Sequence, residues 1–392
     1  MRRLALNWDS GVSEEVFRLV SLRSTEGIVC PRLWDLDFKA DPYTLPFYLL
    51  FLSPTLTKLS LIYSSFCNQS PEEELSIIQP AIVGLDTFPL RDLRLQWFVH
   101  SDASRQMESV ASSAVLRCGP ALKKLYISSP FSDTAVQHIM QLPNLDTWYA
   151  MTGPPRIPDL SRSGIFSRLE HLWLVSESSL AWLTFFTTTA RCTSLGQNPH
   201  TPSDHGPVPR LSNLRILPTV LIDAAFISPI ILLRELTSLK LSSACSSRST
   251  AAPICAFSLT DDNIAEIATA LPHLEVAVLG IVCSANSCQT TVTSLVTFST
   301  HCRNLERLEI HFNTTNLRNE LESVSTDPRL ESLPPLRTRD IFHLSLSSAP
   351  YTINEDDVIL VLKGFRRIFP SLTEIRGIGT SWVELNLRLQ EL

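Results

Sequence analysis

The chain has 392 residues, of which 33 are Lys or Arg, 39 are Asp or Glu and 44% are hydrophobic, so its formal net charge is −6. This composition is typical of a folded globular protein and excludes a disordered one. The acidic balance argues against the electrostatic pattern of most nucleic-acid-binding proteins, and no glycine-rich phosphate loop is visible among only 12 glycines.

The N-terminus begins with a strand-like segment, Leu4 to Leu6, rather than with a targeting sequence. Asn7 and Asp9 interrupt the apolar run before the core of a secretory signal peptide could form. The most apolar later stretch, 220–233, is shorter than the ~20 residues of a membrane-spanning helix. Nine cysteines at irregular spacings fit reduced thiols better than a disulfide framework. We therefore expect a protein of the cytoplasm or nucleus that does not enter a membrane.

One phrase recurs along the whole chain. It consists of an apolar residue, two variable residues, a second apolar residue, one variable residue and a third apolar residue. Copies begin at Leu33, Leu56, Leu90, Leu122, Leu169, Leu236, Leu274, Leu305 and Ile341, with weaker copies at Leu145, Leu214 and Leu372. The steps between copies are irregular in length, so the repeat is not a strict period.

The phrase predicts a short strand, because its last residues alternate between apolar and variable positions. A single strand of this kind cannot bury its apolar face alone. Parallel strands stacked in an array, each followed by a returning segment on the outside, bury a continuous core. The fold class expected is therefore α/β, a leucine-rich-repeat solenoid (horseshoe) with parallel strands on the inner face and helices outside.

Helices are predicted in several of the longer steps. Ser70 to Glu73 forms a capping box with Pro71 at the first helical position, and Thr352 to Glu355 forms a second box. Downstream of Thr260, apolar residues recur on one helical face up to Leu271. A Leu-Pro-x-Leu motif then ends the helix and opens the next strand, as at 142–145 and 271–274.

Two segments interrupt the repeat pattern. Residues 195–209 are rich in Pro and Gly and are interpreted as a disordered insertion loop. Residues 242–258 form a Ser-rich loop that follows a predicted strand. The whole chain, 1–392, is otherwise interpreted as one domain of roughly 11–13 repeats.

The segments 132–145 and 259–274 resemble the repeats of fungal F-box/leucine-rich-repeat (RNI-like) proteins, and the similarity extends over nearly the full chain. The resemblance implies a substrate-recognition subunit of an SCF-type ubiquitin ligase. In such proteins an F-box precedes the first repeat and docks onto a Skp-type adaptor. No F-box is visible before Leu4, so we expect the module either upstream of Met1 or absent.

No catalytic motif is present, and we expect the chain not to be an enzyme and to need no cofactor. Cys283, Cys288, His301 and Cys302 could be offered as a zinc site, but their spacing matches no usual paired-ligand pattern. No metal site is therefore expected. A triad assembled from distant residues is not excluded by a motif search, because a triad is defined by geometry.

The outward positions of the strands predict a binding surface on the inner face. Tyr126, Tyr149 and Trp173 occupy equivalent places in three successive repeats and are expected to form one aromatic ridge. The candidate partner-binding residues are Arg94, Lys124, Tyr126, Tyr149, His171 and Trp173. Aromatic residues and Arg dominate binding hot spots, although the rings could equally pack on one another and cover backbone.

The sequence therefore leads to two main hypotheses. The first is a protein-binding solenoid that holds a protein substrate for a ubiquitin ligase, with catalysis in other subunits. The second is a stand-alone scaffold or adaptor of the same fold with no ligase link. A hydrolase hidden in an insertion is a remote third.

Overall fold

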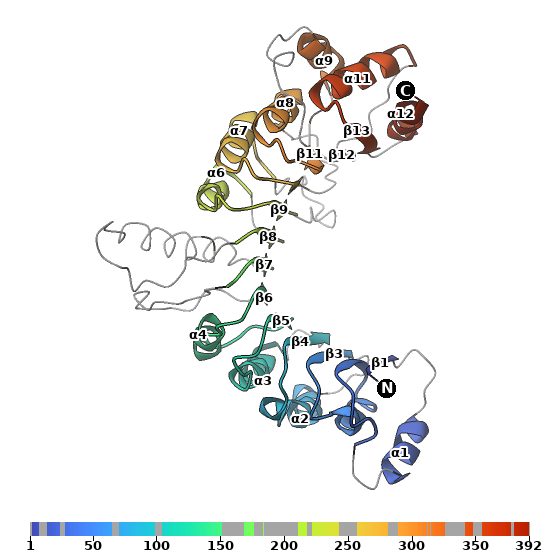
Figure 1. The fold of residues 1–392 in the computed structure, drawn as a ribbon, viewed down its shortest axis with the longest axis vertical. Helices are drawn as coiled ribbons and strands as arrows, with labels where there is room; N and C mark the ends of the chain where they lie inside the picture. Colours follow the sequence, from blue (N-terminus) through green and yellow to red (C-terminus); the bar gives the residue numbers. More distant parts are fainter. Residues whose placement is uncertain are drawn as a thin grey trace, which may run out of the picture. The chain divides into compact units, whose positions relative to one another are not determined.

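The computed structural model describes residues 2–7, 14–23, 28–64, 70–98, 104–150, 168–175, 183, 211–217, 222–242, 257–280, 289–311, 313, 315–325, 342–347, 355–377 and 380–391. The chain divides into two compact units, Met1–Trp173 with Thr189–Arg210 and Leu174–Thr188 with Leu211–Leu392. Within each unit the strands lie side by side in chain order, with helices along one side of them (Figure 1). Every strand pair of known register is parallel.

The first unit begins with a strand and ends at the boundary strand β7, whose last residue is counted in the second unit. Its elements are β1 (Arg3–Asn7), α1 (Glu14–Arg23), β2 (Asp35–Ala40), η2 (Leu45–Phe51), β3 (Lys58–Ser64), α2 (Pro71–Ile82), η3 (Leu85–Thr87), β4 (Asp92–Phe98), α3 (Ser104–Leu116), β5 (Lys124–Ile127), α4 (Asp133–Met140), β6 (Thr147–Ala150) and β7 (His171–Leu174).

The second unit repeats the same arrangement. Its elements are β8 (Asn213–Ile216), α6 (Ala224–Ile227), η5 (Ile230–Leu232), β9 (Ser238–Leu241), α7 (Asp261–Ala270), β10 (Val276–Leu279), α8 (Val292–His301), β11 (Arg307–His311), α9 (Leu317–Ser325), β12 (Phe342–Ser347), α11 (Glu355–Ile368), β13 (Leu372–Gly377) and α12 (Thr380–Glu391).

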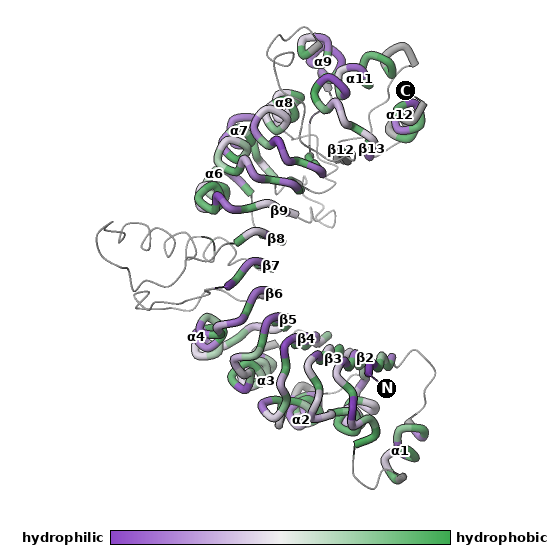
Figure 2. The backbone as a smooth tube through the Cα atoms, viewed as in Figure 1, coloured by the Kyte–Doolittle hydropathy of each residue, from purple (hydrophilic) through white to green (hydrophobic). Residues whose placement is uncertain are grey.

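The core lies between the strands and the helices. The apolar residues of the repeated phrase pair in register across neighbouring strands, as Leu59 pairs with Leu93 and Leu93 with Leu125. All three are at most 1% exposed. Colouring by hydropathy shows hydrophobic and hydrophilic positions side by side along the strands and helices of both units (Figure 2). The alternation therefore directs one face of each strand to the core and leaves the other for solvent.

Helix starts follow the predicted capping signals. Ser70 Oγ accepts a hydrogen bond from the Glu73 N–H at 3.3 Å, and Glu73 Oε2 accepts one from the Ser70 N–H at 3.1 Å. The predicted capping box at the start of α2 is thus confirmed. Residue Thr352 lies outside the described residues, and α11 begins at Glu355.

Successive helices of the second unit are linked near their N-termini by two carboxylates, Asp261 and Glu320. Asp261, the first residue of α7, accepts hydrogen bonds from the Thr291 N–H at 2.8 Å and the Thr291 hydroxyl at 2.7 Å. It also accepts one from the Ser294 hydroxyl of α8. Glu320 of α9 in turn accepts from the Val292 N–H at 3.0 Å. These bonds satisfy N–H groups that have no partner within α8 itself.

The α/β solenoid with parallel strands is confirmed by this architecture. Phe17 of α1 stacks on Phe47 of η2 with 5.6 Å between ring centroids, although the sequence pattern had pointed to neither element. Helix α12, also unexpected, packs against β13. The predicted loop at 195–209 and residues 243–256 of the Ser-rich loop lie outside the described residues.

Candidate functional site

The strand face turned away from the helices, which we call the inner face, carries its side chains in rows. Parallel register places equivalent residues of neighbouring strands side by side. In the first unit the first row contains Arg3, Asp35, Lys58, Asp92 and Lys124. Their charges alternate in sign from strand to strand. We call this set the charge row.

Ion pairs connect the charge row across strands. Asp35 Oδ2 lies 3.4 Å from Arg3 Nε and 3.7 Å from Lys58 Nζ. Lys58 Nζ also lies 3.8 Å from Asp92 Oδ2. Lys58 therefore bridges two carboxylates, and the row largely neutralises itself. The cations of these pairs are exposed to solvent although Asp35 is buried, so each pair contributes little to stability, about 0–1 kcal/mol.

Asp92 is the most perturbed carboxyl of the charge row. Burial raises the pKa of Asp92, and the nearby positive charges of Lys58 and Lys124 oppose that rise. The carboxylates of Asp35 and Asp146 add a smaller upward effect on the same pKa. The two lysines therefore help to keep Asp92 ionised beside its acidic neighbours.

The second row of the inner face brings together the aromatic residues predicted from the sequence. Register pairs Arg94 with Tyr126 and Tyr126 with Tyr149. The Tyr126 and Tyr149 rings stack with 4.0 Å between centroids, and Trp173 meets Tyr149 edge-on at 4.9 Å. We call these three residues the ring stack. Its geometry agrees with the expected aromatic ridge.

Arg94 extends the ring stack at its N-terminal end. Its guanidinium carbon lies 4.8 Å from the centroid of the Tyr126 ring, which is cation–π geometry. Its Nη2 atom donates a hydrogen bond to Gln96 Oε1 at 2.9 Å. Two contacts therefore hold this exposed cation in place, and its charge and the rings form one continuous surface.

Burial differs along the ring stack. Tyr149 is only 8% exposed, because it lies between the other two rings. Tyr126 and Trp173 are half-buried, while Arg94 and Lys124 are exposed. A partner could touch the cations and the two outer rings, whereas Tyr149 acts mainly as the support between them.

His171 and Lys124 lie beside the ring stack rather than in it. Lys124 is the first residue of β5 and His171 the first residue of β7, and both side chains are exposed. The His171 N–H donates to the Asp146 carbonyl at 2.9 Å. All six predicted residues thus lie on one face of four neighbouring strands, β4 to β7. Their role in binding stays a prediction.

Two further cations were missed by the sequence interpretation. Arg91 and Lys123 immediately precede β4 and β5, and the Lys123 N–H donates to the Arg91 carbonyl at 2.8 Å. Both side chains are exposed. Both occupy the first variable position of the repeated phrase, and this shared position in successive repeats is the sequence signal that marks them.

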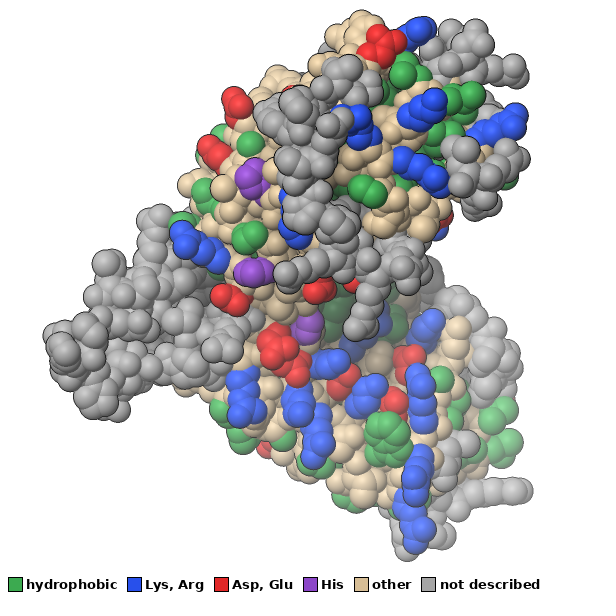
Figure 3. All heavy atoms as spheres, turned by 45° about the horizontal axis from the view of Figure 1, so that its top comes forward, with side chains coloured by type: hydrophobic (Ala, Val, Ile, Leu, Met, Phe, Trp, Pro, Cys, Tyr) green, Lys and Arg blue, Asp and Glu red, His purple; other side chains and the backbone are tan. Residues whose placement is uncertain are grey.

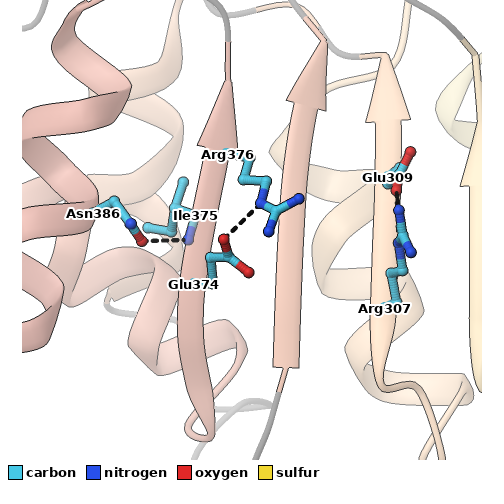
Figure 4. Close-up of polar contacts among 6 residues, drawn as sticks. All are labelled: Arg307, Glu309, Glu374, Ile375, Arg376 and Asn386. Atoms are coloured by element: carbon cyan, nitrogen blue, oxygen red, sulfur yellow. Dashed lines mark hydrogen bonds and ion pairs between the residues drawn. The ribbon is translucent and has the colours of Figure 1, made fainter.

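The second unit carries a different pattern on its inner face. Arg307 Nε donates to Glu309 Oε1 at 2.6 Å on β11, and Arg376 Nε donates to Glu374 Oε1 at 2.6 Å on β13 (Figure 4). The hydrogen bond that Arg376 donates to Glu374 raises the pKa of Arg376, as does the negative charge of Glu374. Each cation is thus satisfied by an acid two residues away on the same strand.

The described residues offer no metal-binding cluster of three or more His, Cys, Asp or Glu side chains. Cys302 is fully buried, and its Sγ atom lies 3.5 Å from the Leu271 carbonyl oxygen. Burial raises the pKa of both Cys118 and Cys302 to about 12, so neither is a reactive thiol. Cys283 and Cys288 lie outside the described residues.

Among known proteins, solved structures match this chain. No protein-family model matches it, and no curated protein matches it. One similar solved structure is a chain in the crystal structure of the Rad7 and Elc1 complex in yeast. The two chains are 14% identical over 96% of this chain and 75% of that chain, with a TM-score of 0.38. So low a score does not relate their functions. Within the described part of this chain, no helix is long and apolar enough to cross a membrane.

Proposed function

We propose that the chain is a non-catalytic protein-interaction solenoid that binds a protein segment on the inner face of its first unit. The observation that carries this proposal is the continuous surface formed by Arg94 and the ring stack. Arg, Tyr and Trp are the residue types enriched in binding hot spots. Rings already held by one another lose little conformational entropy when a partner covers them.

A purely structural role for the rings is the main competitor. Tyr149 is buried by its neighbours and would fill that role whether or not a partner binds. Tyr126 and Trp173 are only half-buried, so they keep surface that mutual packing does not use. Variants of these two outer residues therefore separate the two roles better than variants of Tyr149.

The resemblance to F-box/leucine-rich-repeat proteins extends this proposal. On that basis the bound protein would be a ubiquitylation substrate, and a Skp-type adaptor recruited through an F-box would connect the chain to the ligase. Catalysis would belong to other subunits, in the cytoplasm or the nucleus. The alternative is a scaffold of the same fold that binds proteins on the same surface without any ligase link.

The test is a quantitative affinity capture with the full chain, compared between the native sequence and Tyr126→Ala/Trp173→Ala. Truncation of a hot-spot residue costs at least ~2 kcal/mol, so recovery of the principal partner should fall by about 30-fold or more. Tyr43→Ala/Trp34→Ala is the matched control, because these side chains are 59% and 41% exposed but lie outside the ring stack. Equal recovery by the ring-stack and native proteins would show that the rings serve packing alone.

A second readout of the same experiment addresses the ligase link. A Skp-type adaptor and a cullin among the captured proteins, retained by the ring-stack variant while the principal partner is lost, would support a substrate receptor. Capture of the partner without any adaptor would favour the scaffold. The first unit must still unfold cooperatively in each variant, as followed by thermal denaturation.

A further inference from the structure

Four exposed cations lie on or immediately before the neighbouring strands β4 and β5, beside the ring stack. They are Arg91, Arg94, Lys123 and Lys124, which we call the basic cluster. Neither Arg91 nor Lys123 has a side-chain hydrogen bond or ion pair with any described residue. Lys and Arg side chains are prominent on the visible described surface of this unit, with acids between them (Figure 3). The basic cluster is thus available to an anionic partner.

Lys124 belongs to both the charge row and the basic cluster, but the acids of the row form no ion pair with the other three cations of the cluster. Asp92 pairs in register with Lys124, but its carboxylate already lies 3.8 Å from Lys58 Nζ. Asp35 is likewise bound by Arg3 and Lys58. The excess positive charge therefore lies at β4 and β5, next to the half-buried ring of Tyr126.

The sign of the charge reverses in the next two repeats. Arg91, Lys123, Asp146 and Glu170 occupy the same place in four successive repeats, because the N–H of each later residue donates to the carbonyl of the one before it. The Lys123 carbonyl accepts from Asp146 at 2.8 Å, and the Asp146 carbonyl accepts from Glu170 at 2.9 Å. This row is therefore basic before β4 and β5 and acidic before β6 and β7, and it runs beside the ring stack.

Resting on the proposed protein-binding function, we propose that the bound segment is an extended acidic peptide of fixed direction. Its carboxylates lie over the basic cluster, and an apolar or aromatic side chain lies over Trp173 at the other end of the ring stack. Acidic side chains at that second end would meet Asp146 and Glu170, and like charges oppose binding there. The surface therefore selects which side chains the peptide carries and where along the peptide the acidic and apolar ones stand.

The spacing of the two ends sets the length of the motif. Arg94 on β4 and Trp173 on β7 are three strand steps apart, or about 14 Å at the usual strand separation. An extended chain advances about 3.3 Å per residue. The acidic group and the apolar side chain should therefore be about four or five residues apart in the partner.

A protein segment fits this surface better than a nucleic acid does. Tyr149 is already covered by a ring on each side, so no base can stack on it. A nucleic-acid strand also needs a basic track along its whole path, and here acids follow the cations after two strands.

The experiment selects peptides of about 12 residues from a random phage-displayed library on the full chain, a length that spans the motif with margin. Selected sequences are then made with a fluorescent label, and their binding is measured by anisotropy. We expect Asp or Glu about four or five residues from an apolar or aromatic residue, and on the same side of it in all selected peptides. Raising NaCl from about 0.05 M to about 0.3 M should weaken binding, since screening acts on exposed charges.

Charge reversal at the basic cluster supplies the decisive variant. Arg94→Glu/Lys124→Glu should weaken binding of the selected peptides by about tenfold or more. Arg234→Glu/Lys363→Glu makes the same change in net charge at two exposed residues of the second unit, and it should leave binding unchanged. If the reversed variant does not fold, Arg94→Gln/Lys124→Gln replaces it, with the same direction expected.

The other outcomes separate this inference from the function on which it rests. Peptides without acidic enrichment that still require Tyr126 and Trp173 would overturn the inference and leave the binding surface intact. Failure to select any peptide, or peptides indifferent to both sets of variants, would overturn both. A labelled oligouridylate of similar length that binds more tightly than the peptides, and is lost on charge reversal, would replace the acidic segment by RNA.

Discussion

Asn386 of α12 accepts a hydrogen bond from the Ile375 N–H of β13 at 3.0 Å (Figure 4). In a parallel sheet this N–H would be paired with a carbonyl of the next strand. The side-chain amide oxygen supplies that acceptor instead. Unpaired backbone groups on an edge strand can pair with another chain. Helix α12 therefore also shields the edge of β13, the last described strand.

Replacement of Asn386 should expose this edge. Asn386→Ala removes the acceptor, and a lost hydrogen bond of this kind costs about 1 kcal/mol. The Ile375 amide should then exchange faster with deuterium. Asn386→Asp keeps an oxygen in the same place and should preserve most of the protection. Unchanged exchange at Ile375 in the Ala variant would mean that the hydrogen bond is not formed in solution.

The carboxylate of Asp261 should contribute strongly to the second unit. Asp261→Ala leaves the Thr291 N–H and hydroxyl without their acceptor, so we expect a loss of about 2–3 kcal/mol in the free energy of unfolding. Asp262→Ala is the matched control, since this neighbour is exposed and lies in the same helical turn. Urea unfolding of both variants measures the difference. Equal losses would assign the effect to the helix dipole alone.

The charge row predicts a coupled titration. Lys58→Met removes the largest of the charges that lower the pKa of Asp92, so that pKa should rise further. The carboxyl carbon of Asp92, followed by NMR across the acid range, reports the change. Lys39→Met removes an exposed lysine from β2 outside the row and should leave the Asp92 pKa unchanged. A shift of equal size in both variants would contradict the pairing.

The two buried thiols predict a loss of stability in alkali. Burial raises the pKa of Cys118 and Cys302 from 9.0 to about 12 in the folded chain. Between these values the unfolded thiols lose protons that the folded ones keep, so rising pH favours unfolding. Below pH 9 the thiols are mostly neutral in both states, and the contribution is constant.

The matching variant is Cys118→Ala/Cys302→Ala. The difference in the free energy of unfolding between native and variant proteins should shrink as pH rises from about 9 to about 11. Burial also raises the pKa of Tyr48, but that effect is common to both proteins and cancels. A difference that does not vary with pH would show that the thiols are solvated.

The sequence was sufficient for the parts of the fold that depend on neighbours in the repeat. Leu59 and Leu93 could be assigned to the core because strand alternation decides their direction. The alignment of Tyr126 with Tyr149 followed in the same way, since parallel register copies a repeat position from strand to strand. The sequence could not show that Arg94 lies over Tyr126, because this depends on side-chain rotamers.

Contacts outside the repeat were not predictable in this way. Asn386 lies in a helix with no copy of the repeated phrase. Its contact with Ile375 depends on how that helix packs on β13, which the sequence pattern does not predict. Phe17 of α1 and Phe47 of η2 stack on each other, but neither residue belongs to a copy of the repeated phrase, so no pattern predicts the contact. Arg91 and Lys123 could have been noticed, but their significance depends on the acids that replace them at Asp146 and Glu170.

The charge row also restricts how many repeats the first unit can contain. Positive and negative residues alternate from Arg3 to Lys124, one on each strand. Deletion of the repeat that carries Lys58 would bring Asp35 next to Asp92, and like charges on adjacent strands repel. Deletion of two successive repeats would restore opposite neighbours. Evolution by loss or duplication of repeats in this unit is therefore easier in pairs than singly.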